Sequence, residues 1–241
     1  WLGRNLYELE MFRHCDRVVA LSSADAAIFG RLTSPDKIRV VPTGVNLEDF
    51  PFRPLEGREP GSVVFVGFYG HYPNEDAAVH LCRDIFPRLT RLAPEARLKL
   101  VGSSATPRVH GLAGGAVEVV GTVPQVQPYL AQARVFAAPV RLGRGIKGKI
   151  LEAFASGVPV VALPESCEAM PDARDGEHLR IARTPEEFAR KCAELLHDDA
   201  QSTRLARAAR ELVEKRWGYD RQADLLAEVY RELLAAPNFL R

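Results

Sequence analysis

The sequence predicts an α/β fold built on a doubly wound parallel sheet, followed by a helical C-terminal segment. Short apolar runs rich in Val, Ile, Ala and Leu alternate with longer stretches of helical periodicity, which is typical of a parallel sheet covered by helices on both faces. The last fifth of the chain lacks such runs and is amphipathic. Its 241 residues, 46% of them hydrophobic, suffice for one large domain and part of another.

The first 52 residues are interpreted as the tail of a preceding α/β domain, because two strands are too few to form a core of their own. The expected elements there are a helix, a strand, a helix and a strand at residues 2–14, 17–21, 23–32 and 38–42. The segment PFRPLEGREPG at 51–61 is rich in Pro, Gly and charged residues, and we assign 53–61 to a linker.

Residues 62–216 are predicted to form the main domain. Its first helix is expected over residues 75–92, with Asn74 as the N-cap. The expected strands lie near residues 62–67, 97–102, 117–120, 134–138, 159–163 and 178–181. The helical C-terminal part is expected at residues 185–197, 200–216 and 221–235.

The most informative segment is RLGRGIKGKILEAFASGVPVVAL, from Arg141 to Leu163. Apolar runs at 137–140 and 158–163 flank a glycine-rich loop and a helix, so the unit is predicted to be strand, loop, helix and strand. The helix then begins at the carboxyl end of a strand, where open parallel sheets bind ligands. Four cations in this stretch favour a diphosphate group as the ligand: Arg141, Arg144, Lys147 and Lys149.

Two other phosphate-binding patterns compete for this segment. Residues 143–148 spell GxGxxG, and Glu165 lies where a dinucleotide-binding fold keeps its ribose-binding acid, although here several strands precede the loop. Residues 143–149 spell GxxxxGK, but Ile150 replaces the Ser or Thr that would hold magnesium. A Walker-type NTPase is therefore disfavoured, and a nicotinamide dehydrogenase is kept as a third hypothesis.

The chemistry of the loop can be stated from its residue types. Lys147 and the amides at the helix start are suited to stabilising negative charge on a departing phosphate. Gly143 and Gly145 let the main chain approach the phosphates, and Glu152 can accept two hydrogen bonds from a vicinal diol. The structural alternative is that Glu152 complements the helix dipole and pairs with Lys149.

Read residue by residue, 138–161 fit the pattern aPxrxGxGiKxKxLEAxAxGxPVV, with its Pro, Gly, Lys and Glu positions filled in order. The segment resembles the donor site of retaining glycosyltransferases with the GT-B architecture, in the large family that includes sucrose and glycogen synthases. Residues 65–77 look like the first strand and loop of that donor domain, residues 119–130 like its base-binding segment, and residues 40–50 like the hinge strand. The resemblance implies a Rossmann-like C-terminal domain that binds a nucleotide sugar.

The resemblance also implies a set of site residues. Lys147 and Arg141 are the candidate catalytic residues. The candidate donor-binding residues are Gly67, His71, Val123, Gly143, Gly145, Lys147, Glu152 and Glu168. The alternatives without a functional role are a solvated loop position for His71 and a surface position for Glu168.

The sequence departs from the family pattern at two places. The family's marker is a Glu, seven residues and a second Glu; Glu152 fills the second position, whereas Arg144 stands at the first. Where relatives often read PxGxEGL, residues 164–170 read PESCEAM and lack both glycines. These departures bear on donor-sugar recognition more than on nucleotide recognition.

The resemblance further implies that residues 217–241 return to cover the N-terminal domain, with Leu225, Leu226, Val229 and Leu233 facing it. The implied partners are a nucleotide sugar, a glycan, lipid or small-molecule acceptor, and a missing N-terminal domain, with peripheral membrane association of the full enzyme. No cofactor is expected, and no metal, since the sequence holds no Asp-x-Asp triplet.

Composition narrows the function classes. The 32 basic and 31 acidic residues give a net charge of +1, and no basic run with interleaved aromatics occurs, so nucleic acid is not an expected partner. No stretch approaches the roughly 20 apolar residues of a membrane span. The cysteines show neither metal-binding spacing nor a short disulfide framework, which favours reduced thiols and a cytoplasmic location: Cys15, Cys82, Cys167 and Cys192.

Two main hypotheses follow. The first is a retaining, metal-independent glycosyltransferase that moves a hexose-type sugar from a nucleoside diphosphate to an acceptor. The second is a non-catalytic nucleotide-binding module descended from such a donor domain. Titration with nucleoside diphosphates and NAD discriminates both from the dehydrogenase hypothesis.

Overall fold

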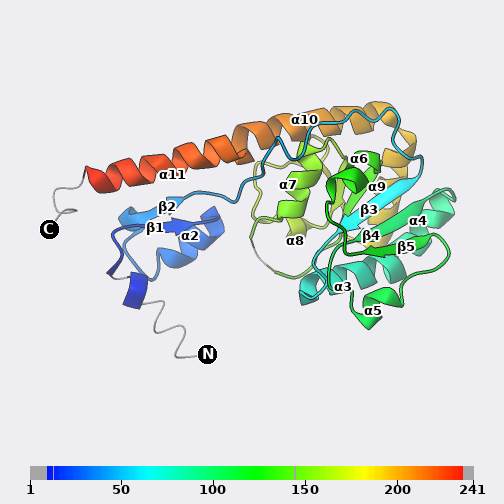
Figure 1. Ribbon diagram of the computed structural model, residues 1–241, viewed down its shortest axis with the longest axis horizontal. Coiled ribbons are helices and arrows are strands. Elements are labelled where there is room, and N and C mark those ends of the chain that lie inside the picture. The colour runs from blue at the N-terminus through cyan, green and yellow to red at the C-terminus, as the bar shows by residue number, and fades with distance from the viewer. Residues whose placement is uncertain (1–9, 13, 144, 236–241) are drawn as a thin grey trace.

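The structure is a computed structural model that describes residues 10–12, 14–143 and 145–235 (Figure 1). Its main body is a six-stranded, fully parallel sheet with the strand order β5-β4-β3-β6-β7-β8. The chain runs outward from β3 in one direction and then from β6 in the other, so the sheet is doubly wound, as predicted. The strands are β3 Ser62–Val66, β4 Arg97–Val101, β5 Val117–Gly121, β6 Val135–Ala138, β7 Val160–Ala162 and β8 Arg180–Ile181.

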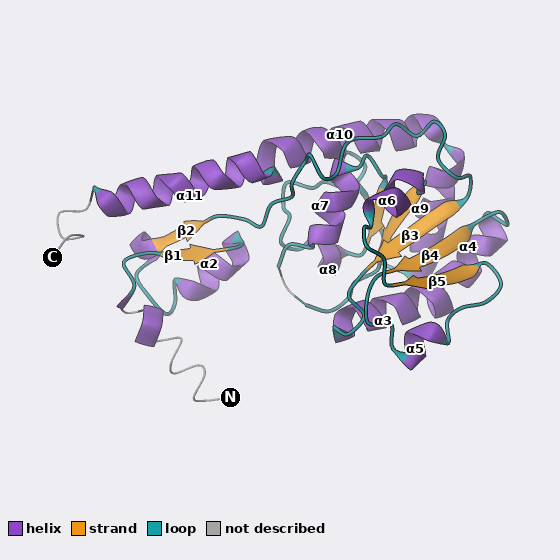
Figure 2. Ribbon diagram, in the orientation of Figure 1, coloured by secondary structure: helices purple, strands orange, loops and turns teal. Residues whose placement is uncertain are grey.

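Helices cover both faces of this sheet (Figure 2). Val63 and Phe65 point into one core with α4 and α9, whereas Val64 and Val66 point into the other with α7 and α10. Burial on both faces explains why these strands are continuous apolar runs. The helices of the body are α3 Tyr72–His80, α4 Phe86–Leu92, α5 Pro107–His110, α6 Gln127–Gln132, α7 Gly148–Ala155, α8 Pro164–Cys167, α9 Pro185–His197 and α10 Asp199–Trp217.

The first helix of the body differs from the prediction at its start. α3 begins at Tyr72 with His71 in the N-cap position, and a π-helical turn, Leu81–Ile85, joins it to α4. The prediction that Asn74 caps this helix is wrong, because its side-chain amide instead donates to the carbonyl of Phe68 at 2.8 Å. Pro73 at the second helical position starts the helix without a side-chain cap.

A small unit precedes the main sheet. Its parallel strands, β1 Val18–Ala20 and β2 Ile38–Val40, flank α2 Ser23–Phe29 and the short 3₁₀ turn Pro35–Lys37. The long helix α11, Tyr219–Leu234, lies along this unit in Figure 1. Most of the helix expected at residues 2–14 lies outside the described residues.

α11 contacts the small unit through ion pairs. Glu232 lies 2.6 Å from the guanidinium of Arg39 and 3.4 Å from that of Arg17. Val229 is buried, whereas Leu226 stays exposed. Among the described helices none is both long and apolar enough to cross a membrane.

The chain crosses between the small unit and the main body at one place. Val45 pairs with Gly218, between α10 and α11: its N–H donates to the Trp217 carbonyl at 2.8 Å and its carbonyl accepts from Tyr219 at 3.2 Å. The segment that enters the main body, at Val45, and the segment that leaves it, at residues 217–219, are therefore hydrogen-bonded to each other.

The segment predicted as a linker packs onto the main body through Arg58. This guanidinium is only 5% exposed, and it donates to the carbonyls of Leu130 and Ala133 at 2.8 and 2.7 Å. It also donates to the carbonyl of Ser156 at 2.9 Å. Burial, with a smaller contribution from the charge of Arg134, lowers the pKa of Arg58 to about 10. Residues 53–61 therefore pack as part of the main body.

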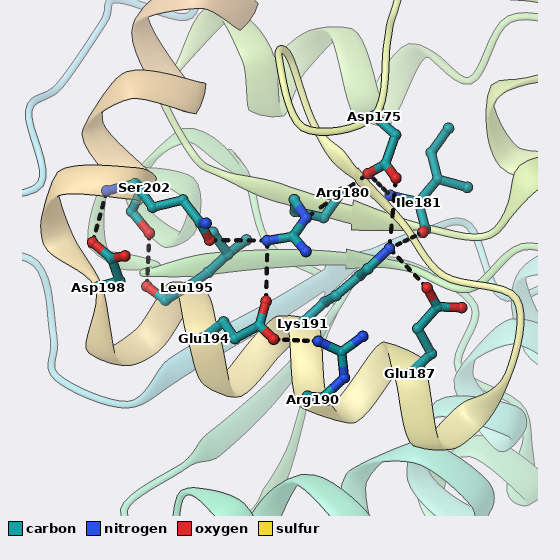
Figure 3. A network of polar contacts seen from close by, with 11 residues as sticks. Asp175, Arg180, Ile181, Glu187, Arg190, Lys191, Glu194, Leu195, Asp198 and Ser202 are labelled. Carbon is teal, nitrogen blue, oxygen red and sulfur yellow. Dashed lines mark hydrogen bonds and ion pairs between the residues drawn. The ribbon is translucent and has the colours of Figure 1, made fainter.

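The edge strand β8 is closed by a polar network (Figure 3). The Lys191 ammonium on α9 donates to the Ile181 carbonyl and lies 2.8 Å from Glu187 and 3.6 Å from Asp175. The Asp175 carboxylate accepts from the Ile181 N–H at 2.8 Å. An unpaired edge invites strand addition, and here side chains occupy its donors and acceptors.

Candidate nucleotide-binding crevice

A hollow of about 320 Å³ lies at the carboxyl ends of the central strands. It is lined by Val66, Gly67, Phe68, Gly102, Ser103, Val123, Val126, Lys149 and Glu152. This is the crevice beside the β3–β6 switch in strand order, where doubly wound sheets bind ligands. A larger depression of about 590 Å³ lies on the outer face of α10, but one helix alone lines it and no strand end contributes to it.

Two glycines bring the main chain close together at the floor of the crevice. A methyl group on Gly67 would lie 3.1 Å from Asn74 Cβ and 3.2 Å from Lys149 Nζ. Gly102 has a φ of +143°, and a Cβ there would lie 1.8 Å from the Gly67 carbonyl oxygen. Only glycine fits at position 102, so the ends of β3 and β4 can touch. Gly67 was predicted from the sequence; Gly102 was missed.

The loop before α7 has the backbone that its glycines predict. Gly143 and Gly145 adopt φ values of +86° and +87°, in the left-handed region. α7 follows with Lys147 in the N-cap position, and no side chain caps this helix start. Its N-terminal amides and dipole thus lie at the carboxyl end of β6, an arrangement suited to anions.

Lys147 folds back over its own loop. Its ammonium donates to the carbonyls of Gly143 at 2.7 Å and Gly145 at 3.3 Å. Burial lowers the pKa of Lys147, and the negative charge of Glu168 opposes that shift. Glu168 itself is exposed at the end of α8.

Glu152 lies in the second turn of α7 and faces the crevice that it lines. Burial raises the pKa of its carboxyl group, while the charge of Lys149 acts in the opposite direction. In the part of the chain that the structure describes, this carboxylate accepts no side-chain hydrogen bond and forms no ion pair. The arrangement leaves its oxygens available to a ligand, and the role of Glu152 in binding a vicinal diol stays a prediction.

Lys149 does not form the expected ion pair along the helix with Glu152. Its ammonium donates to the side-chain oxygen of Asn74 at 2.6 Å and lies 4.5 Å from the centroid of the Phe65 ring. Burial lowers the pKa of Lys149 to about 7; Glu152 opposes the shift and Lys147 adds to it. A cation over an aromatic face is stabilised by the ring quadrupole.

The other predicted residues lie around the crevice rather than in it. Arg141 forms a bidentate pair with Asp76 on α3, at 2.7 and 3.1 Å, and that hydrogen bonding raises the pKa of Arg141. His71 is exposed at the start of α3 and does not line the hollow. Val123 does line it. Arg144 lies outside the described residues.

Besides Gly102, the sequence did not predict three further contributors: Lys149 as a crevice residue, its partner Asn74, and Asp76. A signal for Gly102 existed, because both central strands end in the same Val-Gly pair, at residues 66–67 and 101–102. No pattern in the sequence placed Asn74 beside Lys149, since 75 residues separate them.

A family model matches the residues that form the main body. The family described as Glycosyl transferases group 1 matches residues 60–198, more than half of the chain. The chain belongs to the group 1 glycosyltransferase family. The matched range includes every strand of the main sheet and the whole crevice.

This group 1 chain is similar in sequence to a curated enzyme. It is 28% identical over 198 residues to the phosphatidyl-myo-inositol mannosyltransferase of Mycobacterium leprae (strain TN), covering 79% of this chain and 52% of the relative. This group 1 chain thus spans about half the length of that curated relative.

Among solved structures, sucrose-phosphate synthase from Thermosynechococcus elongatus is similar with a TM-score of 0.79 and 22% identity, over 98% of this chain and 62% of that one. Anabaena HepE, solved with UDP and glucose, is similar with a TM-score of 0.75 and 16% identity, over 90% and 64%. At these identities the similarity shows the fold alone, which is the GT-B architecture.

Proposed function

We propose that this chain is the donor-binding part of a glycosyltransferase that moves a sugar from a nucleoside diphosphate to a glycan, lipid or small acceptor, with retention of configuration. The observation that carries the proposal is the Glu152 carboxylate, which is half-buried, lines the crevice beside the start of α7 and has no side-chain partner among the described residues. A vicinal ribose diol supplies the two donors that such a carboxylate lacks. The fold relatives include one solved with UDP and glucose.

The proposed chemistry uses fixed positive charge. Transfer breaks the bond between the anomeric carbon and a phosphate oxygen, which keeps the electron pair, while the acceptor oxygen forms the new bond and passes its proton to the departing phosphate. Lys147 and the N-terminal amides of α7 stabilise the charge that develops on the diphosphate. Arg141 joins them when the ligand's phosphate competes with Asp76, since the Arg141 side chain is 45% exposed and its ion pair is open to solvent on that side.

The proposal includes the absence of a catalytic metal and of a cofactor, because these cations do the work that a bound divalent ion would do. The acceptor binds across the cleft, on an N-terminal domain of which residues 1–52 form only the tail. Peripheral membrane association of the full enzyme and a cytoplasmic location stay predictions.

A second candidate function is nucleotide binding without transfer. It is favoured by two features of the sequence: Arg144 stands where the family keeps its first Glu, and residues 164–170 lack the two glycines of the family pattern. Both changes affect the place of the donor sugar rather than that of the nucleotide. Hydrolysis or transfer of a nucleotide sugar by the full-length protein would exclude this alternative.

Calorimetric titration with UDP, GDP, ADP and NAD tests the proposal. We expect at least one nucleoside diphosphate to bind, and binding of NAD alone would contradict it. We also expect residues 1–241 to bind the nucleotide without transferring sugar to an added acceptor, because the chain covers 52% of its curated relative. Fast acceptor-dependent transfer by this chain would overturn that expectation.

A further inference from the structure

The side chain of Asn74 connects two walls of the crevice. Its amide nitrogen donates to the Phe68 carbonyl at 2.8 Å, in the loop after β3, and its amide oxygen accepts from Lys149 Nζ at 2.6 Å, on α7. The two contacts use the two ends of the amide, so each end has a fixed role. An aspartate of the same shape would lose the donor, and an alanine would lose both contacts.

Lys149 is confined by this bond and by its surroundings. The Phe65 ring lies on one side of the ammonium, 4.5 Å away, and Gly67 leaves only 3.2 Å to the position that a Cβ would take. An ammonium carries three donors. Within the described residues, Asn74 is its one hydrogen-bond acceptor, so donors remain for a ligand in the hollow that Lys149 lines.

The charges that act on Lys149 come from α7 alone. Glu152 and Lys147 oppose each other, while α3 and β3 contribute the uncharged Asn74 and Phe65. The ammonium therefore has no paired carboxylate in the part of the chain that the structure describes. A ligand that brings negative charge into the hollow supplies what the protein leaves out.

We propose that Asn74 is a positioning residue of the donor site, which holds the Lys149 ammonium between Gly67 and Glu152 so that it donates to the diphosphate of a bound nucleotide. The inference rests on the proposed function and adds two residues to it. On this proposal, binding of the nucleotide is coupled to protonation of the Lys149 amine. Desolvation of Lys149 supports this linkage, because the neutral amine gains its proton when the diphosphate binds.

The experiment titrates UDP into the full 241-residue chain at pH 7.5 and 9.0, where the diphosphate is fully ionised. Repeating each titration in two buffers of different ionisation enthalpy measures the protons taken up. For the unsubstituted chain we expect affinity to fall roughly tenfold between these pH values, with net proton uptake. In Lys149→Met both effects disappear.

Asn74 variants test the positioning role. We expect Asn74→Ala to lower UDP affinity roughly tenfold, because the ammonium loses its fixed place. In Asn74→Asp the new carboxylate raises the pKa of Lys149, so the amine is already charged and proton uptake at pH 7.5 is lost. A merely structural role would change the melting temperature and leave proton uptake as it was.

Asn46→Ala is the matched control. Asn46 also uses both ends of its amide, donating to Asp49 at 3.0 Å and accepting from the Glu48 N–H at 3.2 Å, but it lies outside the crevice. It should leave UDP binding and proton uptake unchanged. If Asn74→Ala fails to fold, the near-isosteric Asn74→Asp and an NMR titration of ¹³C-labelled lysines still report the pKa of Lys149.

The outcomes separate the two claims. UDP binding with unchanged affinity and proton uptake in both Asn74 variants overturns the positioning role and leaves the proposed function standing. A chain that binds none of UDP, GDP and ADP overturns both. Loss of affinity together with the altered proton uptake supports the inference.

Discussion

Two desolvated lysines of the same body, the half-buried Lys149 on α7 and the buried Lys191 on α9, have different surroundings. Lys191 contacts two carboxylates, Glu187 and Asp175, and a backbone carbonyl of the edge strand. Lys149 has one amide oxygen and an aromatic face. The fold itself neutralises the first charge, whereas it leaves the second to be neutralised by something else.

The difference teaches how to read a buried charge. A buried cation that contacts carboxylates of its own chain has a structural role, as Lys191 does at the edge strand β8 (Figure 3). A cation that is desolvated without counterions, in a hollow at the carboxyl ends of strands, is prepared for a ligand. The crevice should therefore respond to substitution in binding, and the edge network should respond in stability.

The largest effect is expected at the edge network. Lys191→Met removes the ammonium while Glu187 and Asp175 stay close together, so about 2–4 kcal/mol of unfolding free energy should be lost; the lower half is favoured because both carboxylates reach solvent. Urea denaturation measures the loss. UDP affinity of the folded fraction should not change, and a loss of binding without a loss of stability would break the comparison.

The next effect is expected in the crevice. Lys149→Met should lower UDP affinity by about 1.5–3 kcal/mol, roughly tenfold to a hundredfold, because a charge-assisted contact to phosphate is removed. Stability in urea should stay the same or rise, since an apolar chain of similar length replaces a buried amine with one hydrogen bond. A variant that is strongly destabilised yet binds UDP normally would make Lys149 a structural residue like Lys191.

A smaller and more selective effect is expected at Glu152. Glu152→Gln keeps one acceptor but loses the charge and the second acceptor, so UDP should weaken by about 1–2 kcal/mol. The 2′,3′-dideoxy analogue has no diol and should bind both proteins alike. Equal weakening of the two ligands would assign Glu152 to the helix dipole instead.

The smallest effect concerns pH. Between about pH 7.5 and 8.5 Lys149 is mostly neutral in the folded chain, because burial lowers its pKa to about 7, but it stays protonated when unfolded. The unfolded state then binds more protons, so stability rises with pH, by at most about 1.4 kcal/mol per unit from this group. Comparing the slope of the unsubstituted chain with that of Lys149→Met cancels all other titrating groups. Identical slopes would contradict the assigned shift.

The sheet could be predicted from the sequence, because strands buried on both faces must be continuous apolar runs, as 62–66 and 135–138 are. Gly143 and Gly145 were predicted to let the main chain approach a ligand, and their positive φ values use a freedom that glycine has and other residues lack. That Glu152 faces the crevice could be predicted because it lies in the second turn of α7, the helix that starts beside the loop of Gly143 and Gly145.

What the sequence could not predict depends on side chains that meet across the fold. Helical spacing favours a bond between Lys149 and Glu152, three residues apart, and that local preference was outweighed by Asn74 from another helix. Asn74 was expected to cap, since that is what an isolated Asn before a helix does, but Pro73 moved the helix start upstream of it. Long-range contacts of this kind leave no trace in local patterns.

The pairing of Val45 with Gly218 has a mechanical consequence. The two covalent connections between the small unit and the main body pass through one point and are hydrogen-bonded there, at 2.8 and 3.2 Å. Arg58 fixes the chain to the body soon after the first connection, which leaves little slack beyond it. A small twist at Gly218 would be multiplied along the straight length of α11 and would displace its far end most, together with the small unit that Glu232 contacts.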